Sequence, residues 1–352
     1  MKIVFMGTAE LSGASLAALA RDQRFSVAAV VTQPDQARGR VSKKQPVLPV
    51  KALAQTLNLP LLQPGRARDD AFIGELRSLA PDLIVVVAYG QILPPAILDL
   101  PRHGCLNVHT SLLPKYRGAA PIQWAIANGE KETGVTIMKM DAGLDTGPIL
   151  AQRRTPIESG DDAATLHDRL GRLGAELLLA TLPDYVAGKI QPQPQPAEGV
   201  SHAPKIKKED GRMDWSLPAQ TIVNRLRAFT PWPGAFTFLP EPVGRASPRA
   251  EANISERLAG SLAPPQLLKI WKAEVVEAAA GRDSALRCPD AAARRPYLEE
   301  KPGTILFADK NGIMVACGQG TLRIQELQRE GGRRLSAAEF LAGHPLKAGM
   351  KI

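Results

Sequence analysis

Two polar side chains stand two residues apart in a short apolar run and could do chemistry together. They are Asn107 and His109, and the other residues of the run, Cys105, Leu106 and Val108, are apolar. Side chains two apart on a strand point to the same face of a sheet. An amide that donates hydrogen bonds beside an imidazole that gives or takes a proton suits acyl chemistry. The alternative is a hydrogen-bonded pair at the end of a strand, and this pair alone leaves both interpretations open.

Two loops elsewhere carry groups that could join this pair. Residues 89–91 (YGQ) follow the continuous apolar run 83–88, which is typical of a central parallel strand. At the carboxyl edge of such a sheet a flat heterocycle could find backbone hydrogen bonds and apolar walls. Asp141 and Asp145 lie in a loop punctuated by glycines. An aspartate in such a loop is most often a turn former that bonds its own backbone.

The string CLNVHTSLLPKYRGAAPI at 105–122 resembles the N-x-H-x-S-L-L-P-x-x-R-G signature of the folate-dependent formyltransferases. Within them it is most similar to the branch that acts on methionyl-tRNA. Further motifs match in order: KIVFMGTAE, VVTQPD before a basic loop, VVVAYGQILP, ETGVTIMKMDAGLDTG, and DWS with PWPGA. Several spaced motifs in the right order are far more specific than one. The chain departs from the family at Ala9 and Leu11, where Pro and an aromatic residue are usual.

The resemblance implies three catalytic residues and a folate co-substrate. Asn107 would donate to the oxyanion of the formyl group, and His109 would share that role or shuttle protons. Asp145 would hold the tautomer of His109 and assist removal of the amine proton, whereas Asp141 keeps the interpretation of a turn former. The co-substrate would be 10-formyltetrahydrofolate, and no metal is expected. Two segments would frame the folate: Ser111, Leu112, Leu113 and Pro114, and Tyr89, Gly90 and Gln91.

A basic loop follows the second predicted strand. Its charge comes from Arg38, Arg40, Lys43 and Lys44, in a stretch with no regular apolar period. In an arbitrary protein a solvated loop would be the better interpretation. The resemblance implies instead that an inserted basic loop here reaches the acceptor end of the tRNA. The net charge of +9 favours a polyanionic partner without establishing one.

Bulk composition narrows the class of protein. A chain of 352 residues is long for one core, so we expect two domains. No apolar run reaches the ~18 residues of a membrane span, and the chain opens directly on a strand pattern, so we expect a cytoplasmic protein. The three cysteines, Cys105, Cys288 and Cys317, lack C-x-x-C spacing. Neither a disulfide framework nor a metal cluster is therefore predicted.

The hydrophobic pattern predicts an α/β fold in the first part of the chain. Residues 1–190 alternate strand and helix signals, as in a Rossmann-like, doubly wound and mainly parallel sheet. The turn after the first strand contains one glycine, Gly7, and lacks the G-x-G-x-x-G fingerprint. We therefore set a dinucleotide aside.

The second part of the chain has a different pattern. Residues 191–205 begin with QPQPQP, which predicts an extended linker. Residues 206–352 alternate short strands with turns, as in a small barrel. The resemblance implies an open barrel similar to the oligonucleotide-binding fold, which would bind tRNA. Two stretches rich in Ala, Arg and Pro, near 240–265 and 281–300, match nothing in the family and are interpreted as loop insertions.

Three functions are compatible with these patterns. The first is transfer of a formyl group to the α-amino group of methionyl initiator tRNA by a monomeric enzyme. The second is a related formyltransferase acting on a small amine, or a formyl-folate hydrolase, and the basic loop and the barrel argue for the first. The third is a non-catalytic nucleic-acid-binding protein. The intact set of Asn107, His109 and Asp145 argues against the third.

Overall fold

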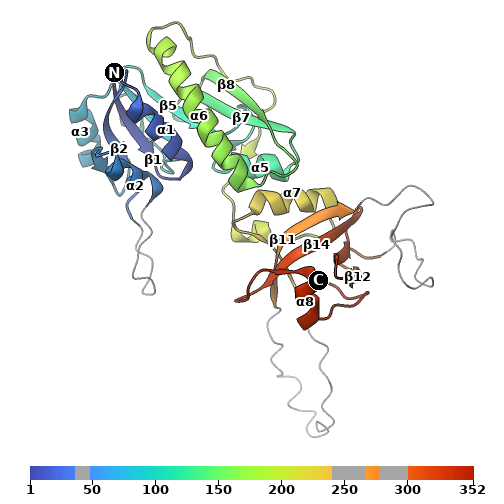
Figure 1. Ribbon diagram of the computed structural model, residues 1–352. Helices are drawn as coiled ribbons and strands as arrows, with labels where there is room; N and C mark the ends of the chain where they lie inside the picture. The colour runs from blue at the N-terminus through green and yellow to red at the C-terminus, as the bar shows by residue number, and fades with distance from the viewer. Residues whose placement is uncertain (36–47, 240–265, 277–299) are drawn as a thin grey trace, which may run out of the picture. The chain divides into compact units, whose positions relative to one another are not determined.

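A computed structural model describes residues 1–35, 48–239, 266–276 and 300–352 (Figure 1). The chain forms two compact units, one of residues 1–126 with 130–206 and one of residues 127–129 with 207–352. Some predicted features lie outside the described residues. They are the four basic residues of the predicted loop, the whole insertion at 240–265 and all of the insertion at 281–300 except its last residue.

The first unit is built on a seven-stranded sheet with the order β3-β2-β1-β4-β5-β7-β8. Strands β1 to β5 run parallel, and β7 and β8 extend the sheet antiparallel. The predicted mixed fold with a mainly parallel sheet is confirmed. The strands are β1 (Lys2–Gly7), β2 (Ser26–Val31), β3 (Leu61–Leu62), β4 (Leu83–Val87), β5 (Cys105–His109), β7 (Glu132–Lys139) and β8 (Ile149–Pro156).

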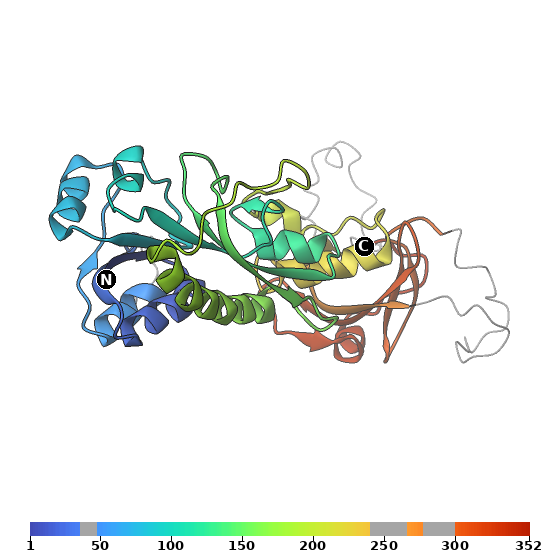
Figure 2. The same ribbon diagram turned by 90° about the horizontal axis from the view of Figure 1, so that it is seen from above.

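Helices cover both faces of this sheet, and α1 and α6 lie side by side on one of them (Figure 2). The opposite face packs against α3 and α4, whose Phe72, Leu76 and Ile97 join the buried cluster of Val4 and Val86. All five residues of β4 are buried, as expected for a central strand covered on both sides. The helices are α1 (Leu11–Arg21), α2 (Pro49–Thr56), α3 (Asp70–Leu79), α4 (Pro95–Leu98), α5 (Pro121–Ala127) and α6 (Ala163–Val186).

The segment predicted as a linker belongs to the first unit. Gln193 forms an antiparallel bridge with Ile149 of β8, and β9 (His202–Ala203) pairs in parallel with β6 (Arg117–Gly118). The segment is extended, as predicted. It is paired with strands of the first unit and is not an unpaired connector between the two units. In this stretch glutamines separate the prolines, so backbone N–H groups remain available for pairing.

The second unit contains an antiparallel sheet of order β10-β11-β14-β13-β12, with β15 paired to β14. Helix α7 packs on β11, and Phe340 of α8 is fully buried in the core of this unit. The predicted small β domain is confirmed. Its elements are η1 (Lys208–Gly211), α7 (Ala219–Phe229), β10 (Ala235–Phe238), β11 (Leu267–Val276), β12 (Ile305–Asp309), β13 (Gly312–Ala316), β14 (Thr321–Arg329), β15 (Leu335–Ser336) and α8 (Ala337–Gly343).

No helix in the described ranges is both long and apolar enough to cross a bilayer. Helix α6 is the longest, with 24 residues, and it begins with a capping box in which Asp162 accepts from the backbone N–H of Thr165. Its buried residues recur at helical spacing along one face. The helix therefore acts as a cover for the sheet.

A close approach of α6 supports β5. A Cβ atom placed at Gly174 would lie 2.8 Å from Cγ1 of Val108, the residue between Asn107 and His109. Real Cβ atoms essentially never come so close to a neighbour. The absence of a side chain at position 174 therefore lets the helix lie directly against this strand.

Replacing this glycine tests the close approach. Gly174→Ala should lower the free energy of unfolding by about 1 kcal/mol, because overpacking a β-branched neighbour costs about 1–3 kcal/mol and helix propensity returns only about 1. Gly171→Ala on the same helix is the control. Its Cβ would meet Leu11 at 3.5 Å, an ordinary contact, so it should be neutral or stabilising. Urea unfolding midpoints measure both, and equal effects would contradict the packing argument.

Candidate active site

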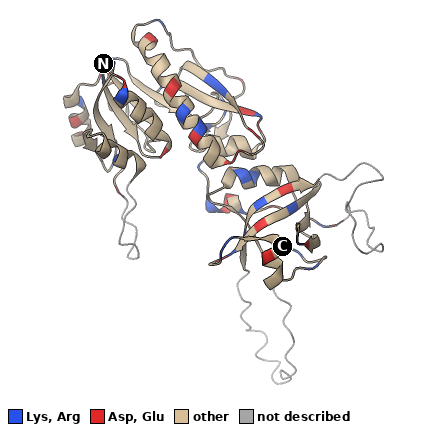
Figure 3. Ribbon diagram, in the orientation of Figure 1, with Lys and Arg blue, Asp and Glu red and all other residues tan. Residues whose placement is uncertain are grey.

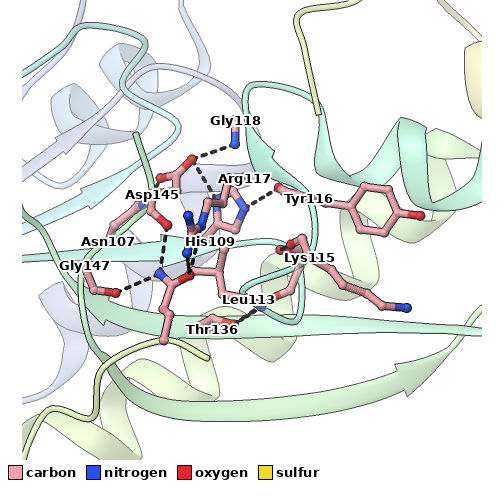
Figure 4. Close-up of polar contacts among 12 residues, drawn as sticks. Asn107, His109, Leu113, Lys115, Tyr116, Arg117, Gly118, Thr136, Asp145 and Gly147 are labelled. Atoms are coloured by element: carbon pink, nitrogen blue, oxygen red, sulfur yellow. Dashed lines mark hydrogen bonds and ion pairs between the residues drawn. The ribbon is translucent and has the colours of Figure 1, made fainter. Parts of the chain in front are cut away.

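Strand β5 holds Asn107 and His109 in the interior of the sheet. Val86 of β4 pairs with Asn107 on one side, and β7 pairs with both residues on the other. His109 is 6% exposed, and Asn107 is partly buried. Because both neighbouring strands hold the backbone, the two side chains are fixed on one face of the sheet, and Figure 4 shows them converging with Asp145.

The carboxylate of Asp145 joins this pair from a separate loop. Its Oδ1 accepts from Asn107 Nδ2 at 3.2 Å, and its Oδ2 accepts from the backbone N–H of Gly118 at 2.8 Å. The same Oδ2 lies 3.7 Å from His109 Nδ1. The backbone of Asp145 is left-handed, with φ of 53°, a conformation that aspartate tolerates better than most residues. Such a backbone persists only where its surroundings hold it.

The other ring nitrogen of His109 is also fixed. Its Nε2 lies 2.9 Å from the carbonyl oxygen of Tyr116. A carbonyl can only accept, so Nε2 carries a hydrogen and, in the neutral ring, Nδ1 carries the lone pair. The Tyr116 carbonyl thus sets the tautomer, a role that the family resemblance implied for Asp145. Tyr116 is itself left-handed, with φ of 60°.

The three residues line a cavity of 490 Å³ at the carboxyl ends of β4 and β5. Two loops border it, 88–93 after β4 and 141–145 after β7. The size is within the range of small-molecule and cofactor sites, which combine apolar walls with a few polar groups. The apolar part of the wall comes from residues of α1, β4, β7 and the loops: Leu11, Val86, Leu93, Met138, Met140 and Leu144.

The loop at 89–91 lines this cavity, and hydrogen bonds from other parts of the first unit fix its conformation. The carbonyl of Tyr89 accepts from Thr8 Oγ1 and from Gln33 Nε2, both at 3.0 Å. Gly90 has φ of 84°, where a side chain would be strained. Gln91 accepts from the backbone N–H of Ala67 at 2.7 Å. These contacts fix the conformation of the loop where it lines the cavity.

Tyr89 is 2% exposed and belongs to the core cluster beneath the sheet. Its hydroxyl has no hydrogen-bond partner in the described part of the chain. Burial raises the pKa of this phenol to about 12, because the charged form would lose its hydration. The side chain of Tyr89 thus serves packing.

The segment from Ser111 to Pro114 does not line this cavity. The hydroxyl of Ser111, a fully buried residue, donates to the carbonyl of Lys115 at 2.6 Å. The N–H of Leu113 donates to Thr136 Oγ1 at 3.1 Å. Leu112, Leu113 and Pro114 line a separate cavity of 270 Å³. These contacts shape the turn that leads from His109 to Tyr116.

Asp141 also lines the larger cavity but bonds within its own loop. Its Oδ1 accepts from the N–H of Gly143 at 3.0 Å and from Thr146 Oγ1 at 2.7 Å. This pattern agrees with the interpretation of Asp141 as a turn former.

Two groups at the site have no role predicted from the sequence. One is the N–H of Gly118, a backbone donor to Asp145. The other is Gln195, whose Nε2 donates to the carbonyls of Asp145 and Gly147. The signal for Gly118 lies in the R-G of the motif, but only the folded chain shows that Gln195, fifty residues away, reaches the same loop.

The sequence of residues 1–182 matches the formyl transferase family, and residues 205–345 match the C-terminal domain of formyl transferases. The chain belongs to the formyl transferase family. The resemblance read from the motifs is thus confirmed at the level of the family. Within the described ranges, this formyl transferase has no group of three or more His, Cys, Asp or Glu side chains that could hold a metal ion.

Curated relatives match this formyl transferase along its whole length. It is 46% identical to the methionyl-tRNA formyltransferase of Citrifermentans bemidjiense over 349 residues, 99% of this chain and 95% of that protein. It is 45% identical to the enzyme of the same name from Geobacter sulfurreducens over 352 residues, 100% of this chain and 96% of that protein.

Solved structures resemble this formyl transferase in fold alone. One is the N-formyltransferase from Helicobacter canadensis in complex with folinic acid and dTDP-3-aminofucose, with a TM-score of 0.58 and 17% identity. The match covers 92% of this chain and 98% of that one. Another is HypX from Aquifex aeolicus with tetrahydrofolic acid, with a TM-score of 0.54 and 17% identity over 97% of this chain and 47% of that one.

The buried phenol gives a test of how the loop at 89–91 contributes. Tyr89→Phe removes a hydroxyl that is desolvated without compensation, so the free energy of unfolding at neutral pH should stay within about 1 kcal/mol or rise. Folate binding should change by less than about twofold, since the Tyr89 side chain is buried in the core cluster. Urea unfolding and fluorescence titration measure the two effects. A large loss of folate affinity would show that the hydroxyl itself contacts the ligand.

The pKa shift of Tyr89 gives the variant a signature at high pH. In the unfolded chain the phenol ionises near pH 10, while the folded phenol stays protonated to about 12. The unfolded state then binds fewer protons, so the stability of the parent falls as pH rises between these values. The stability of Tyr89→Phe should fall less over the same interval.

Proposed function

We propose that this formyl transferase moves the formyl group of 10-formyltetrahydrofolate to the α-amino group of methionyl initiator tRNA, giving the formylated aminoacyl-tRNA used to start translation. The observation that carries the proposal is the cluster of Asn107, His109 and Asp145 on the wall of the 490 Å³ cavity. The chain that carries this cluster is 45–46% identical to enzymes named methionyl-tRNA formyltransferase, and it is about as long as they are.

The residues around the cavity fit a reduced folate. The pteridine ring is flat and rich in hydrogen-bonding groups, and it needs apolar walls together with backbone donors and acceptors at its edge. The methionines and aliphatic residues supply the walls, and the fixed backbones of loops 88–93 and 141–145 supply the polar edge. When bound, the folate supplies the activated formyl group.

Asn107 is proposed to stabilise the charge that develops on the formyl oxygen. One hydrogen of its Nδ2 is bonded to Asp145, and an amide nitrogen carries a second. That hydrogen is available to the oxygen as the amine adds to the carbonyl carbon. A preorganised donor aimed at a developing oxyanion is commonly worth ~10²–10³ in turnover.

His109 is proposed to take the proton that the attacking amine loses. Its Nε2 is engaged with Tyr116, so Nδ1 carries the free lone pair on the side of Asp145. Once Nδ1 is protonated, the carboxylate 3.7 Å away balances the new positive charge. The same proton can then pass to the departing nitrogen of the folate. Asp145 is thus proposed to act on both His109 and Asn107, since it balances the charge of the imidazolium and also orients the amide.

The acceptor assignment is supported by charge as well as by the relatives. Lys and Arg outnumber Asp and Glu among the described residues of the second unit, and Figure 3 shows them on α7, β11 and β14. The basic loop with Arg38, Arg40, Lys43 and Lys44 is proposed to contact tRNA phosphates. Ser111 to Pro114 are proposed to support the folate site indirectly, through the turn after β5. We further propose a monomer acting in the cytoplasm, with the second unit as the tRNA-binding domain.

The decisive experiment compares acceptors. Purified protein with 10-formyltetrahydrofolate is offered charged initiator tRNA, free methionine and a small nucleotide amine in parallel. Formylation should occur on the charged tRNA with a kcat/KM larger by orders of magnitude than on either small amine. Preferential transfer to a small amine, or release of formate without transfer, would refute the proposed acceptor.

The two aspartates of the loop give a matched pair of variants. Asp145→Asn should lower turnover by about 10²-fold or more, because an amide neither balances an imidazolium nor accepts from Gly118 as strongly. Asp141→Asn should cost less than about tenfold, since Asp141 bonds only within its own turn. Single-turnover formylation measures both. Equal damage from the two substitutions would mean that the roles are misassigned.

The basic loop gives a test of the tRNA contact. Arg40→Ala with Lys43→Ala should weaken tRNA binding and flatten the dependence of log K on log salt by roughly one to two units. The control pair Arg153→Ala with Arg154→Ala removes the same charge from β8, where both side chains are already ion-paired. It should leave the slope nearly unchanged. If the salt dependence of tRNA binding is unaltered in the loop variant, the basic loop does not contact tRNA and is a solvated surface loop.

A further inference from the structure

Gln195 makes four hydrogen bonds at the edge of the candidate site. Its Nε2 donates to the carbonyl oxygens of Asp145 and Gly147, both at 2.8 Å. Its Oε1 accepts from Nε and Nη2 of Arg117, at 3.0 and 2.7 Å. Carbonyls can only accept and a guanidinium can only donate, so the orientation of the amide is unambiguous. The side chain uses both hydrogens of its nitrogen and both lone pairs of its oxygen.

The two carbonyls belong to the turn that holds Asp145 in its left-handed conformation. On the far side of this turn, a Cβ atom at Gly147 would lie 1.8 Å from the carbonyl oxygen of Lys139. Lys139 also donates its N–H to the carbonyl of Pro148 at 2.9 Å. The turn is therefore held by the end of β7 on one side and by Gln195 on the other.

Arg117 connects the same side chain to the second half of the site. Its neighbour Tyr116 accepts from His109, and its neighbour Gly118 donates to Asp145. Through Arg117, Gln195 thus ties the segment that orients His109 to the turn that presents Asp145. All of these residues lie within the first unit.

We propose that Gln195 is a positioning residue of the formyl transfer reaction, which acts by fixing the backbone of Asp145 and thereby its carboxylate relative to His109 and Asn107. The inference rests on the proposed catalytic role of Asp145. Gln195 does not line the cavity, so its contribution is to the geometry of the reacting groups and not to substrate binding.

The two N–H groups of Gln195 Nε2 are proposed to hold Asp145 in position, because they donate to the carbonyls of Asp145 and Gly147. Gln195→Ala should lower kcat by about 10- to 100-fold. It removes all four hydrogen bonds, including the two that hold the carbonyls of Asp145 and Gly147, and a small displacement of Asp145 is expensive in rate. The KM values for 10-formyltetrahydrofolate and charged tRNA should stay within about threefold. Gln195→Glu should be impaired to a similar degree. A carboxylate keeps both contacts with Arg117 but has no hydrogen to give to the carbonyls of Asp145 and Gly147.

Gln193→Ala is the matched control from the same segment. The side chain of Gln193 donates only to the carbonyl of Gln191, an exposed contact, and its pairing with Ile149 uses the backbone. Its kcat should match that of the parent protein. Thermal unfolding of all variants shows whether any loss of rate reflects loss of the fold, and Gln195→Glu serves if Gln195→Ala does not fold.

A double-mutant cycle separates positioning from general support. If Gln195 acts through Asp145, then Gln195→Ala added to Asp145→Asn should slow single-turnover transfer by less than about twofold beyond Asp145→Asn alone. Independent, multiplying losses would overturn the proposal, and so would a near-normal kcat of Gln195→Ala. The single variant Asp145→Asn tests the proposed function separately. If it keeps near-normal turnover, the catalytic role of Asp145 fails and the positioning role of Gln195 fails with it.

Discussion

The arrangement of the site depends on the contacts that the carboxylate of Asp145 makes. It receives a side-chain N–H from β5 and a backbone N–H from the segment after it, and it faces the imidazole of His109. Residues 107–118 and the loop after β7 therefore meet at one partly buried charge. A charge in such a place is tolerated only where donors compensate its lost hydration. The left-handed backbone at Asp145 is the conformational cost of bringing the charge there.

The sequence predicted the sheet because its central strands are apolar throughout, as β4 shows with the run LIVVV. It did not predict β8, whose residues alternate between partly buried and exposed and include Gln152, Arg153 and Arg154. That strand is defined by its pairing with β7, and such long-range pairing leaves a weak local signal. Helix α8 was missed for another reason. Its signal is the capping box of Ser336 and Glu339, which is short and easily read as part of a turn.

Some residues of the candidate site could likewise be predicted from the sequence, and others could not. Asn107 and His109 follow from strand periodicity, since two residues apart means one face. The role of Asp145 came from likeness to the family, because nothing local separates it from Asp141. The structure separates them, since one carboxylate reaches β5 and the other closes its own turn. The contact with Gln195 had no local signal at all. A glutamine between prolines resembles a solvated connector until the chain around it is folded.

The extended segment at 191–206 has a consequence for how this chain can be divided. Its backbone pairs with β8 and β6, and the side chain of Gln195 bonds to the loop that carries Asp145. Cutting the chain after residue 190, where composition changes, would remove a strand of the first unit together with a neighbour of the active site. A border after Ile206 would keep both. Recombination between relatives should therefore preserve the proline-rich stretch with the domain that precedes it, so that the two are inherited as one block.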